Sequence, residues 1–263
     1  MRRVFSISST AGFVFLLAIV CSALVAAQQP AQGQGEARQG GRGGGGGNGA
    51  ARASTAPAFF KVEWVQPQGQ TGQVPVVQGN VADPNLEVKW YGEAAKHLLT
   101  SGTPGSDTTP FSAWSGECDG PFAITFKQKN NYADLSGLGK VRWVIKTSGF
   151  HVVRPVVKLA DGTMLVGDHV DAAVPMLVTS EFALSGVRWI KLDPMRIVTL
   201  NNGGSSPNNE IWVPNPDLTK VDEVGFADLM PGSGHGTGGY IHLSTIEVFA
   251  KPVPRAAASA SAR

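Results

Sequence analysis

Cysteine is scarce in this sequence. Its 263 residues include two cysteines, Cys21 and Cys118, and we expect Cys21 to be removed with an amino-terminal signal. Cys118 would then stand alone, which excludes an intramolecular disulfide, so the fold must be held together by packing. A segment of roughly 200 residues buries about 70% of its unfolded surface, which suffices without cross-links. We therefore expect Cys118 to be a small buried apolar residue rather than a nucleophile.

The sequence also lacks an apolar run long enough to cross a membrane as a helix, which takes ~20 residues. The apolar stretch Gly12–Cys21 is shorter, follows Arg2 and Arg3, and leads into small residues that end at Ala27. This order is typical of a cleavable secretory signal. We expect residues 1–27 to be a signal peptide and the mature chain to be exported, periplasmic or extracellular, with no membrane span. An uncleaved anchor and a lipoprotein are the alternatives.

Large apolar side chains are almost absent from residues 28–55, which include the glycine run Gly43–Gly47. Such a segment cannot bury enough surface to offset the entropy lost on ordering, so we expect a disordered glycine-rich linker. Small and polar residues likewise predict a disordered tail over 255–263. The candidate domain is therefore 56–254. Arginines among the linker glycines are typical of some nucleic-acid-binding segments, but an exported chain would not meet nucleic acid.

The candidate domain lacks an excess of basic charge. Residues 56–254 hold 15 lysines and arginines against 19 aspartates and glutamates, a net charge of −4, although the whole chain is formally +2. This mild acidity argues against a surface for phosphate backbones or anionic membranes. It is compatible with a neutral polar ligand. The sequence does not determine the oligomeric state.

Sustained helical periodicity is missing from the candidate domain, where short apolar or alternating runs are separated by glycine, proline, asparagine and aspartate. The alternation in Val141–Lys146 buries one face of a strand. Asp161-Gly162 supplies the backbone angles of a tight hairpin turn, and Glu93–Thr100 is expected to form one or two helical turns at most. These patterns predict an all-β fold, an antiparallel β-sandwich or jelly roll. The expected strands are Phe59–Val65, Leu86–Tyr91, Phe122–Lys127, Gly139–Thr147, His151–Leu159, Met164–Asp168, Met176–Glu181, Val187–Leu192, Arg196–Thr199, Glu223–Asp228 and Ile241–Phe249.

Three segments resemble strands of galactose-binding-domain-like sandwiches. Asp134–Lys146 (DLSGLGKVRWVIK) is similar to a D-L-S-G-x-x-x-[LV]-x-[FW]-x-[VI]-[KR] motif, Val187–Leu192 to a tryptophan-bearing strand, and Val221–Phe226 to a penultimate strand. The resemblance spans about Asn85–Ala250. It implies the fold of carbohydrate-binding modules that are attached to secreted enzymes, but it identifies no specific family. The resemblance implies no cofactor other than a structural calcium ion.

The resemblance places that calcium near the first and last strands. The residues of this sequence that would match are Glu247 on the last strand and Glu63 or Glu87 near the start. Calcium sites built from loops normally contain several aspartates. No such loop is present, so the calcium site rests on the resemblance alone.

Aromatic residues beside loops are the best candidates for ligand contacts. A carbohydrate site combines an exposed flat ring with a few polar partners. Trp143 and Trp189 occupy apolar strand centres and are expected in the core. Three other aromatic residues lie beside loop residues and are expected to stack on a ligand, namely Trp114, Tyr132 and Trp212. The expected hydrogen-bonding partners are Glu117, Asp119, Asp228, Asn131 and His235.

The favoured function is a secreted, non-catalytic binding module for carbohydrate or another polar component of the cell envelope. One alternative is a glycan hydrolase with Glu117 and Asp119 as its acid and base, since both could lie on one face of a strand. Asp222 and Glu223 are direct neighbours and would point to opposite faces. The other alternative is a structural or adhesion protein. The histidines have no metal-binding spacing, and residues 231–239 match neither a nucleophile elbow nor a phosphate loop.

Overall fold

The computed structural model describes residues 55–204, 207–230 and 239–256. The expected signal peptide, nearly all of the expected linker and His235 lie outside the described residues. Within these three ranges, no helix is long and apolar enough to span a membrane.

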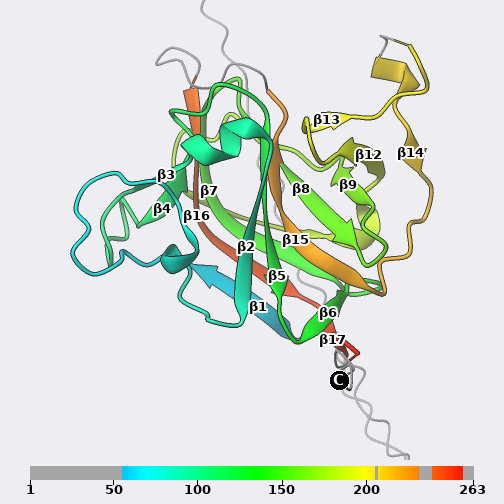
Figure 1. The fold of residues 1–263 in the computed structure, drawn as a ribbon, viewed down its shortest axis with the longest axis horizontal. Coiled ribbons are helices and arrows are strands. Elements are labelled where there is room, and N and C mark those ends of the chain that lie inside the picture. The colour runs from blue at the N-terminus through cyan, green and yellow to red at the C-terminus, as the bar shows by residue number, and fades with distance from the viewer. Residues whose placement is uncertain (1–54, 205–206, 231–238, 257–263) are drawn as a thin grey trace, which may run out of the picture. The chain divides into compact units, whose positions relative to one another are not determined.

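The first of two antiparallel sheets carries the long carboxy-terminal strand at its centre (Figure 1). Its strand order is β11-β7-β16-β4-β3, and β1 pairs with the second half of β16 beside β4. The strands are β1 (Ala58–Glu63), β3 (Leu99–Ser101), β4 (Ser112–Trp114), β7 (Lys140–Gly149), β11 (Val178–Ala183) and β16 (Gly239–Phe249).

The second sheet has the order β13-β12-β9-β8-β15-β5-β2, and shorter strands extend it at the edges. Its main strands are β2 (Leu86–Tyr91), β5 (Phe122–Gln128), β8 (Val152–Leu159), β9 (Met164–Gly167), β12 (Trp189–Asp193), β13 (Val198–Thr199) and β15 (Val221–Asp228). The additional strands are β6 (Asn131–Asp134), β10 (Asp171–Ala172), β14 (Trp212–Val213) and β17 (Lys251–Pro254).

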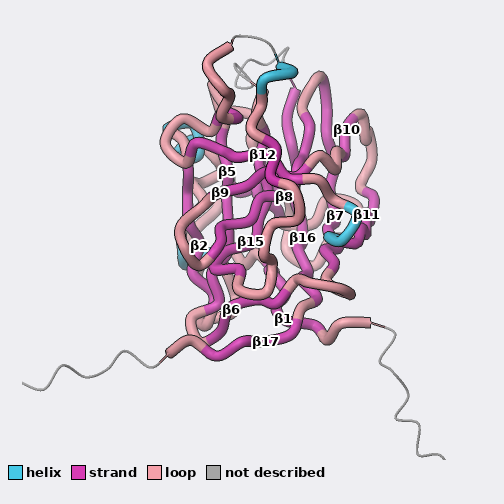
Figure 2. Tube along the Cα trace, turned by 90° about the vertical axis from the view of Figure 1, so that its right-hand side faces the viewer, coloured by secondary structure: helices cyan, strands magenta, loops and turns pink. Residues whose placement is uncertain are grey.

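Helix is confined to short turns in the described ranges (Figure 2). They are the 3₁₀ turns η1 (Gln78–Asn80), η2 (Glu93–His97), η3 (Leu184–Gly186) and η4 (Pro207–Asn209). The prediction of a short helical turn after Tyr91 is therefore confirmed by η2. The all-β antiparallel sandwich predicted from the sequence is also confirmed.

The core lies between the two sheets and follows the alternation of the strands. On β7, Val141, Trp143 and Ile145 point inward and are at most 1% exposed. They pack in one cluster with Trp189 of β12 and with the aromatic residues of β5 and β15. Trp143 and Trp189 are thus core residues, as predicted. A smaller apolar cluster, which includes Ile197, covers part of the outer face of the second sheet.

Two turns show how local sequence determines the path of the chain. In the predicted hairpin between β8 and β9, Gly162 has φ 89°, and the Asp161 carboxylate accepts a hydrogen bond of 2.8 Å from the Thr163 amide. In the D-L-S-G motif, the Asp134 carboxylate accepts bonds from the backbone N–H and the hydroxyl of Ser136, at 3.0 and 2.6 Å. This second turn carries the chain from β6 in one sheet to β7 in the other.

Candidate functional site

The structure does not bring the three predicted aromatic contacts to one place. Trp114 lies on β4 in the first sheet, whereas Tyr132 lies on β6 and Trp212 on β14, both in the second sheet. Each therefore has to be considered with its own neighbours.

Tyr132 is covered by a residue that the sequence places in the tail. The guanidinium carbon of Arg255 lies 4.0 Å from the centroid of the Tyr132 ring. Arg255 also donates hydrogen bonds to the carboxylate of Asp222 and to the backbone oxygen of Gln128. The side-chain oxygen of Gln128 accepts the N–H of Asn131 at 2.6 Å. The ligand contacts of Tyr132 and Asn131 stay a prediction, and the structure places both residues at an edge where Arg255 and Gln128 already contact them.

Asp228 is also unsuited to a ligand contact. Its side chain is fully buried, and its carboxylate lies 2.6 Å from Nδ1 of His151, which is equally buried. Burial raises the pKa of Asp228 above its usual range. Because both groups are enclosed, we assign the pair a structural role and correct the expectation for Asp228.

The loop between β4 and β5 carries the two carboxylates that were considered as an acid and a base. Glu117 and Asp119 are exposed and flank Cys118, which is completely buried. Burial, and to a smaller extent the nearby carboxylates, raises the pKa of Cys118 to about 12. The prediction of a buried Cys118 is confirmed.

The outer face of the first sheet brings Trp114 together with residues that the sequence analysis did not select. On β16, Ile241 and Leu243 point into the core, so Tyr240 and His242 point outward. The pairing register places His242 opposite Lys146 of β7 on one side and opposite Trp114 of β4 on the other. We call Trp114, Tyr240, His242 and Lys146 the aromatic face.

The three rings of the aromatic face form one partly exposed group. The centroid of Trp114 is 6.3 Å from that of Tyr240 and 6.4 Å from that of His242, and Tyr240 and His242 are 5.2 Å apart. The ammonium group of Lys146 lies 5.6 Å from the Tyr240 centroid. A Cβ atom on Gly116 would lie within 2.4 Å of ring atoms of Trp114, so the loop that follows β4 packs closely against this ring.

Two grooves border the aromatic face. One has a volume of ≈ 440 Å³ and the other of ≈ 430 Å³, and Lys146 lines both. Serine and threonine residues supply hydroxyl groups along their walls, and no described residue that lines them is an aspartate, a glutamate or a second lysine or arginine. The hydroxyl-bearing residues include Ser101, Thr108 and Thr109 in the first groove, which His242 also lines, and Ser148 and Tyr240 in the second.

His242 is neutral at physiological pH. Burial, and to a smaller extent the positive charge of Lys146, lowers its pKa from 6.5 to about 4. The neutral imidazole has one donor and one acceptor nitrogen, which suits hydrogen bonds to hydroxyl groups. The aromatic face therefore carries one positive charge, on Lys146, beside uncharged hydrogen-bonding groups.

The depressed pKa of His242 predicts a pH-dependent contribution to stability. Between pH ~6.5 and ~4 the unfolded chain binds a proton that the folded chain excludes, so this contribution is lost as the pH falls. Stability measured by urea unfolding at pH 7 and pH 4.5 should therefore fall less in His242→Gln than in the unchanged protein. The expected difference is on the order of 1–2 kcal/mol, after allowance for partial exposure of the ring. Identical pH profiles would show that the ring is not shielded from water.

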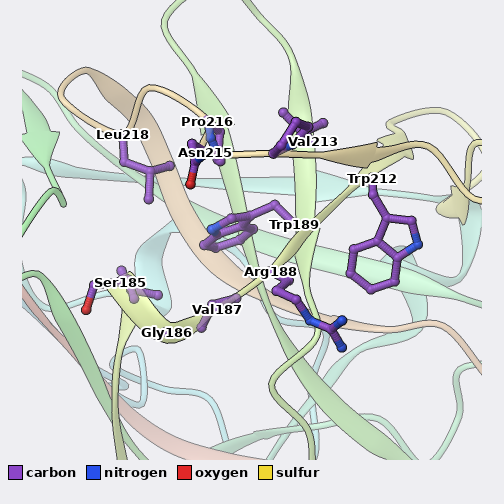
Figure 3. Close-up of a pocket in the computed structure, with 12 residues that line it drawn as sticks. Ser185, Gly186, Val187, Arg188, Trp189, Trp212, Val213, Asn215, Pro216 and Leu218 are labelled. Carbon is purple, nitrogen blue, oxygen red and sulfur yellow. The ribbon is translucent and has the colours of Figure 1, made fainter.

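Trp212 lies at a different groove, of ≈ 770 Å³, at the edge of the second sheet (Figure 3). Trp189 lies at the middle of this groove, with Trp212 and Arg188 at one end and Leu218 at the other. The Arg188 guanidinium lies 4.9 Å from the Trp212 ring and is held by Asp168 at 2.7 Å. Arg188 covers the Trp212 ring, and half of the residues that line this groove are proline, valine or leucine. We therefore consider this groove less suited to a sugar than the aromatic face.

The outer face of the second sheet contains a buried ionic network that the sequence did not indicate. The Glu223 carboxylate accepts hydrogen bonds from the Tyr91 hydroxyl at 2.7 Å, from the Lys158 ammonium at 3.3 Å, and from the Thr125 hydroxyl. Burial raises the pKa of Tyr91 to about 12. Glu223 is 2% exposed and its carboxylate is occupied by these three donors, so we assign it a structural role.

The side chains of Asp222 and Glu223 do not point to opposite faces of the sheet, as those of neighbouring residues in a regular strand would. The pairing of β15 with β8 shifts register between Val221 and Glu223, which marks a β-bulge. Asp222 therefore contacts Lys127, which points from β5 to the same outer face. The expectation that Asp222 and Glu223 point to opposite faces is wrong for this reason.

The glutamates that the resemblance assigned to calcium do not form a site. Glu63 is paired with Lys61 at 2.5 Å, Glu87 with Lys89 at 2.8 Å, and Glu247 with Arg142 at 3.0 Å. No group of three potential ligands among histidine, cysteine, aspartate and glutamate occurs in the described part of the chain. The residues present therefore do not fit the calcium ion that the resemblance implies.

No family model matches the sequence, and no curated protein matches it. Among solved structures, the chain is similar to the family 11 carbohydrate-binding module of the cellulosomal cellulase Lic26A-Cel5E of Clostridium thermocellum. The TM-score is 0.39 at 14% identity, over 69% of this chain and 96% of that one. It is also similar to an exo-beta-agarase, with a TM-score of 0.35 at 8% identity, over 70% of this chain and 25% of that one.

A third similar structure is the K1 cleaved adhesin domain of Lys-gingipain from Porphyromonas gingivalis W83. Its TM-score is 0.30 at 12% identity, over 69% of this chain and 99% of that one. This chain thus spans about a quarter of the agarase and nearly all of the two modules. The similar structures include carbohydrate-binding modules, and the similarity concerns the sandwich fold.

Proposed function

We propose that this protein is an exported, non-catalytic carbohydrate-binding protein and that its ligand stacks on the aromatic face. The observation that supports this proposal most strongly is that Trp114, Tyr240 and His242 form one partly exposed ring group. His242 lines one groove that contains hydroxyl side chains, and Tyr240 lines another. Sugar rings have apolar C–H faces that pack on aromatic rings, and hydroxyl groups that need directed partners. The aromatic face offers both within one outer sheet surface.

The direct test is the affinity of purified protein for soluble polysaccharides, measured by affinity gel electrophoresis and calorimetry. Trp114→Ala should weaken binding at least about tenfold, which corresponds to ~1.4 kcal/mol, because it removes the largest stacking surface. Tyr240→Ala should act in the same direction. Thermal unfolding of both variants establishes that they fold, and two variants are used because the Trp114 ring also packs on Gly116.

Trp212→Ala is the matched control, since Trp212 is 40% exposed but lies on the other sheet. Its binding should equal that of the unchanged protein. Loss of binding in Trp212→Ala together with full binding in Trp114→Ala and Tyr240→Ala would move the site to the groove of Figure 3 and overturn the proposal.

A glycan hydrolase is the second candidate. One observation favours it: the loop that bears the exposed Glu117 and Asp119 begins directly after Trp114 and packs on its ring through Gly116. The double variant Glu117→Ala, Asp119→Ala separates the two candidates. A binding protein retains its affinity in this variant, whereas a hydrolase releases reducing sugar in the unchanged protein and loses that activity in the variant.

A further inference from the structure

The basic residues on the outer face of β7 differ in their partners. Lys140 donates to Glu181 at 2.9 Å, and Arg142 contacts both Glu181 and Glu247, at 2.6 and 3.0 Å. Lys146 follows them on the same face of the same strand, yet it makes no ion pair with any described residue. Its neighbours on this face are the ring of Tyr240 and the imidazole of His242. The positive charge of Lys146 is therefore not neutralised by a neighbouring carboxylate.

The position of Lys146 directs this charge at the two grooves of the aromatic face. Lys146 is partly buried and lines both grooves, whose other described lining residues are uncharged. His242 is neutral and does not compete for a negative partner. A partly buried ammonium group gains more from an opposite charge than an exposed one does, because it is screened less by water and salt. The aromatic face thus combines ring surfaces, hydroxyl groups and one available cation.

We infer that the ligand of the aromatic face is an acidic saccharide, whose anionic group pairs with Lys146 while its ring stacks on Trp114 and Tyr240. This inference rests on the proposed function and names its ligand class. The domain as a whole has a net charge of −4 and therefore does not attract acidic polymers at long range. Preference for an anion must then come from a local contact, and Lys146 is the residue placed to make it. The anionic group is a carboxylate or a sulfate, which share this chemistry.

The test uses the full chain and three polysaccharide classes: a neutral galactan, a polyuronate such as polygalacturonate, and a sulfated galactan. The unchanged protein should bind at least one acidic polymer about tenfold more tightly than the neutral one, which is ~1.4 kcal/mol. Comparison of the polyuronate with the sulfated galactan identifies the anionic group. The preference should shrink between 50 mM and 500 mM salt, where the screening length falls to a few ångströms.

Lys146→Met removes the charge and keeps the apolar stem of the side chain. It should lower the affinity for the acidic polymer more than the affinity for the neutral polymer, and so abolish the preference between them. Lys191→Met is the matched control, because Lys191 is an exposed lysine on β12 of the other sheet. It changes the net charge by the same amount and should leave the preference intact.

Each outcome separates this inference from the proposed function. The inference of an acidic ligand would be overturned if the unchanged protein bound acidic and neutral polymers with equal affinity. It would also be overturned if Lys146→Met lowered the affinity for both polymers equally. In either case, binding through Trp114 would still stand. If Lys191→Met weakens acidic binding as much as Lys146→Met does, the effect is one of net charge and the inference is wrong. Absence of binding to all three polymers would overturn the proposed function itself.

Discussion

Glu223→Ala is expected to lower the free energy of unfolding by about 3–5 kcal/mol, because it leaves a partly buried cation and a buried hydroxyl without their acceptor. The Glu223 carboxylate on β15 accepts from Tyr91 on β2, Thr125 on β5 and Lys158 on β8. One side chain thus links four neighbouring strands of the second sheet. After the substitution, the Thr125 hydroxyl, which is completely buried, has lost its acceptor on Glu223.

Glu181→Ala is the matched control for this prediction. Glu181 also accepts from two cations, Lys140 and Arg142, but its side chain is 38% exposed where that of Glu223 is 3% exposed. An exposed ion pair contributes about 0–1 kcal/mol, since water solvates the separated charges. Urea unfolding of both variants, followed by tryptophan fluorescence, measures the difference. Equal losses of stability would contradict the role assigned to burial.

A double substitution tests whether the cost arises from the unpaired charge. Glu223→Leu combined with Lys158→Met removes both ions, and apolar replacement of a buried ion pair is often close to neutral. The double variant should therefore be more stable than Glu223→Ala alone. If it is less stable, the ion pair itself contributes favourably and the unpaired cation is not the main source of the loss.

The alternation of side chains along strands could be predicted from the sequence, and it accounts for the core. Val141–Lys146 alternates as expected, which places Trp143 inside and Lys146 outside. Along β16 the expected alternation holds only on each side of a β-bulge between Leu243 and Thr245, so the buried positions change from Ile241 and Leu243 to Ile246 and Val248. The pairing of strands could not be predicted in this way. β16 lies between β7 and β4, so Trp114 meets a histidine 128 positions further along the chain. No local pattern encodes such a contact.

Two further features escaped the sequence for physical reasons. A β-bulge depends on the register of two strands, so the joint outward direction of Asp222 and Glu223 is not visible in either strand alone. Arg255 follows two prolines in a small-residue tail, yet it is fixed by Asp222 and by the ring of Tyr132. Its role comes from tertiary contacts, which composition does not report.

Gly225→Ala is expected to destabilise the domain by about 3 kcal/mol or more. Gly225 lies on β15 between Thr125 of β5 and Val156 of β8, its antiparallel partners on the two sides. A Cβ atom at this position would lie 1.9 Å from the backbone oxygen of Ile124 and 2.6 Å from the Cα atom of Thr125. Backbone atoms cannot rotate away as a side chain does, so β5 and β15 would have to separate at the centre of the sheet.

Gly186→Ala provides the control, because a Cβ atom at Gly186 meets no atom within 4 Å and its φ angle is not positive. Its effect on the free energy of unfolding, measured with urea, should stay within about 0.5 kcal/mol, as for most surface substitutions. The same strand pair carries Thr125 and Glu223, so Gly225→Ala should also disturb the ionic network and lower the unusually high pKa of Tyr91, which ultraviolet titration of the tyrosines would detect. A Gly225→Ala protein as stable as Gly186→Ala would mean that β5 and β15 are not packed as closely as their backbones indicate.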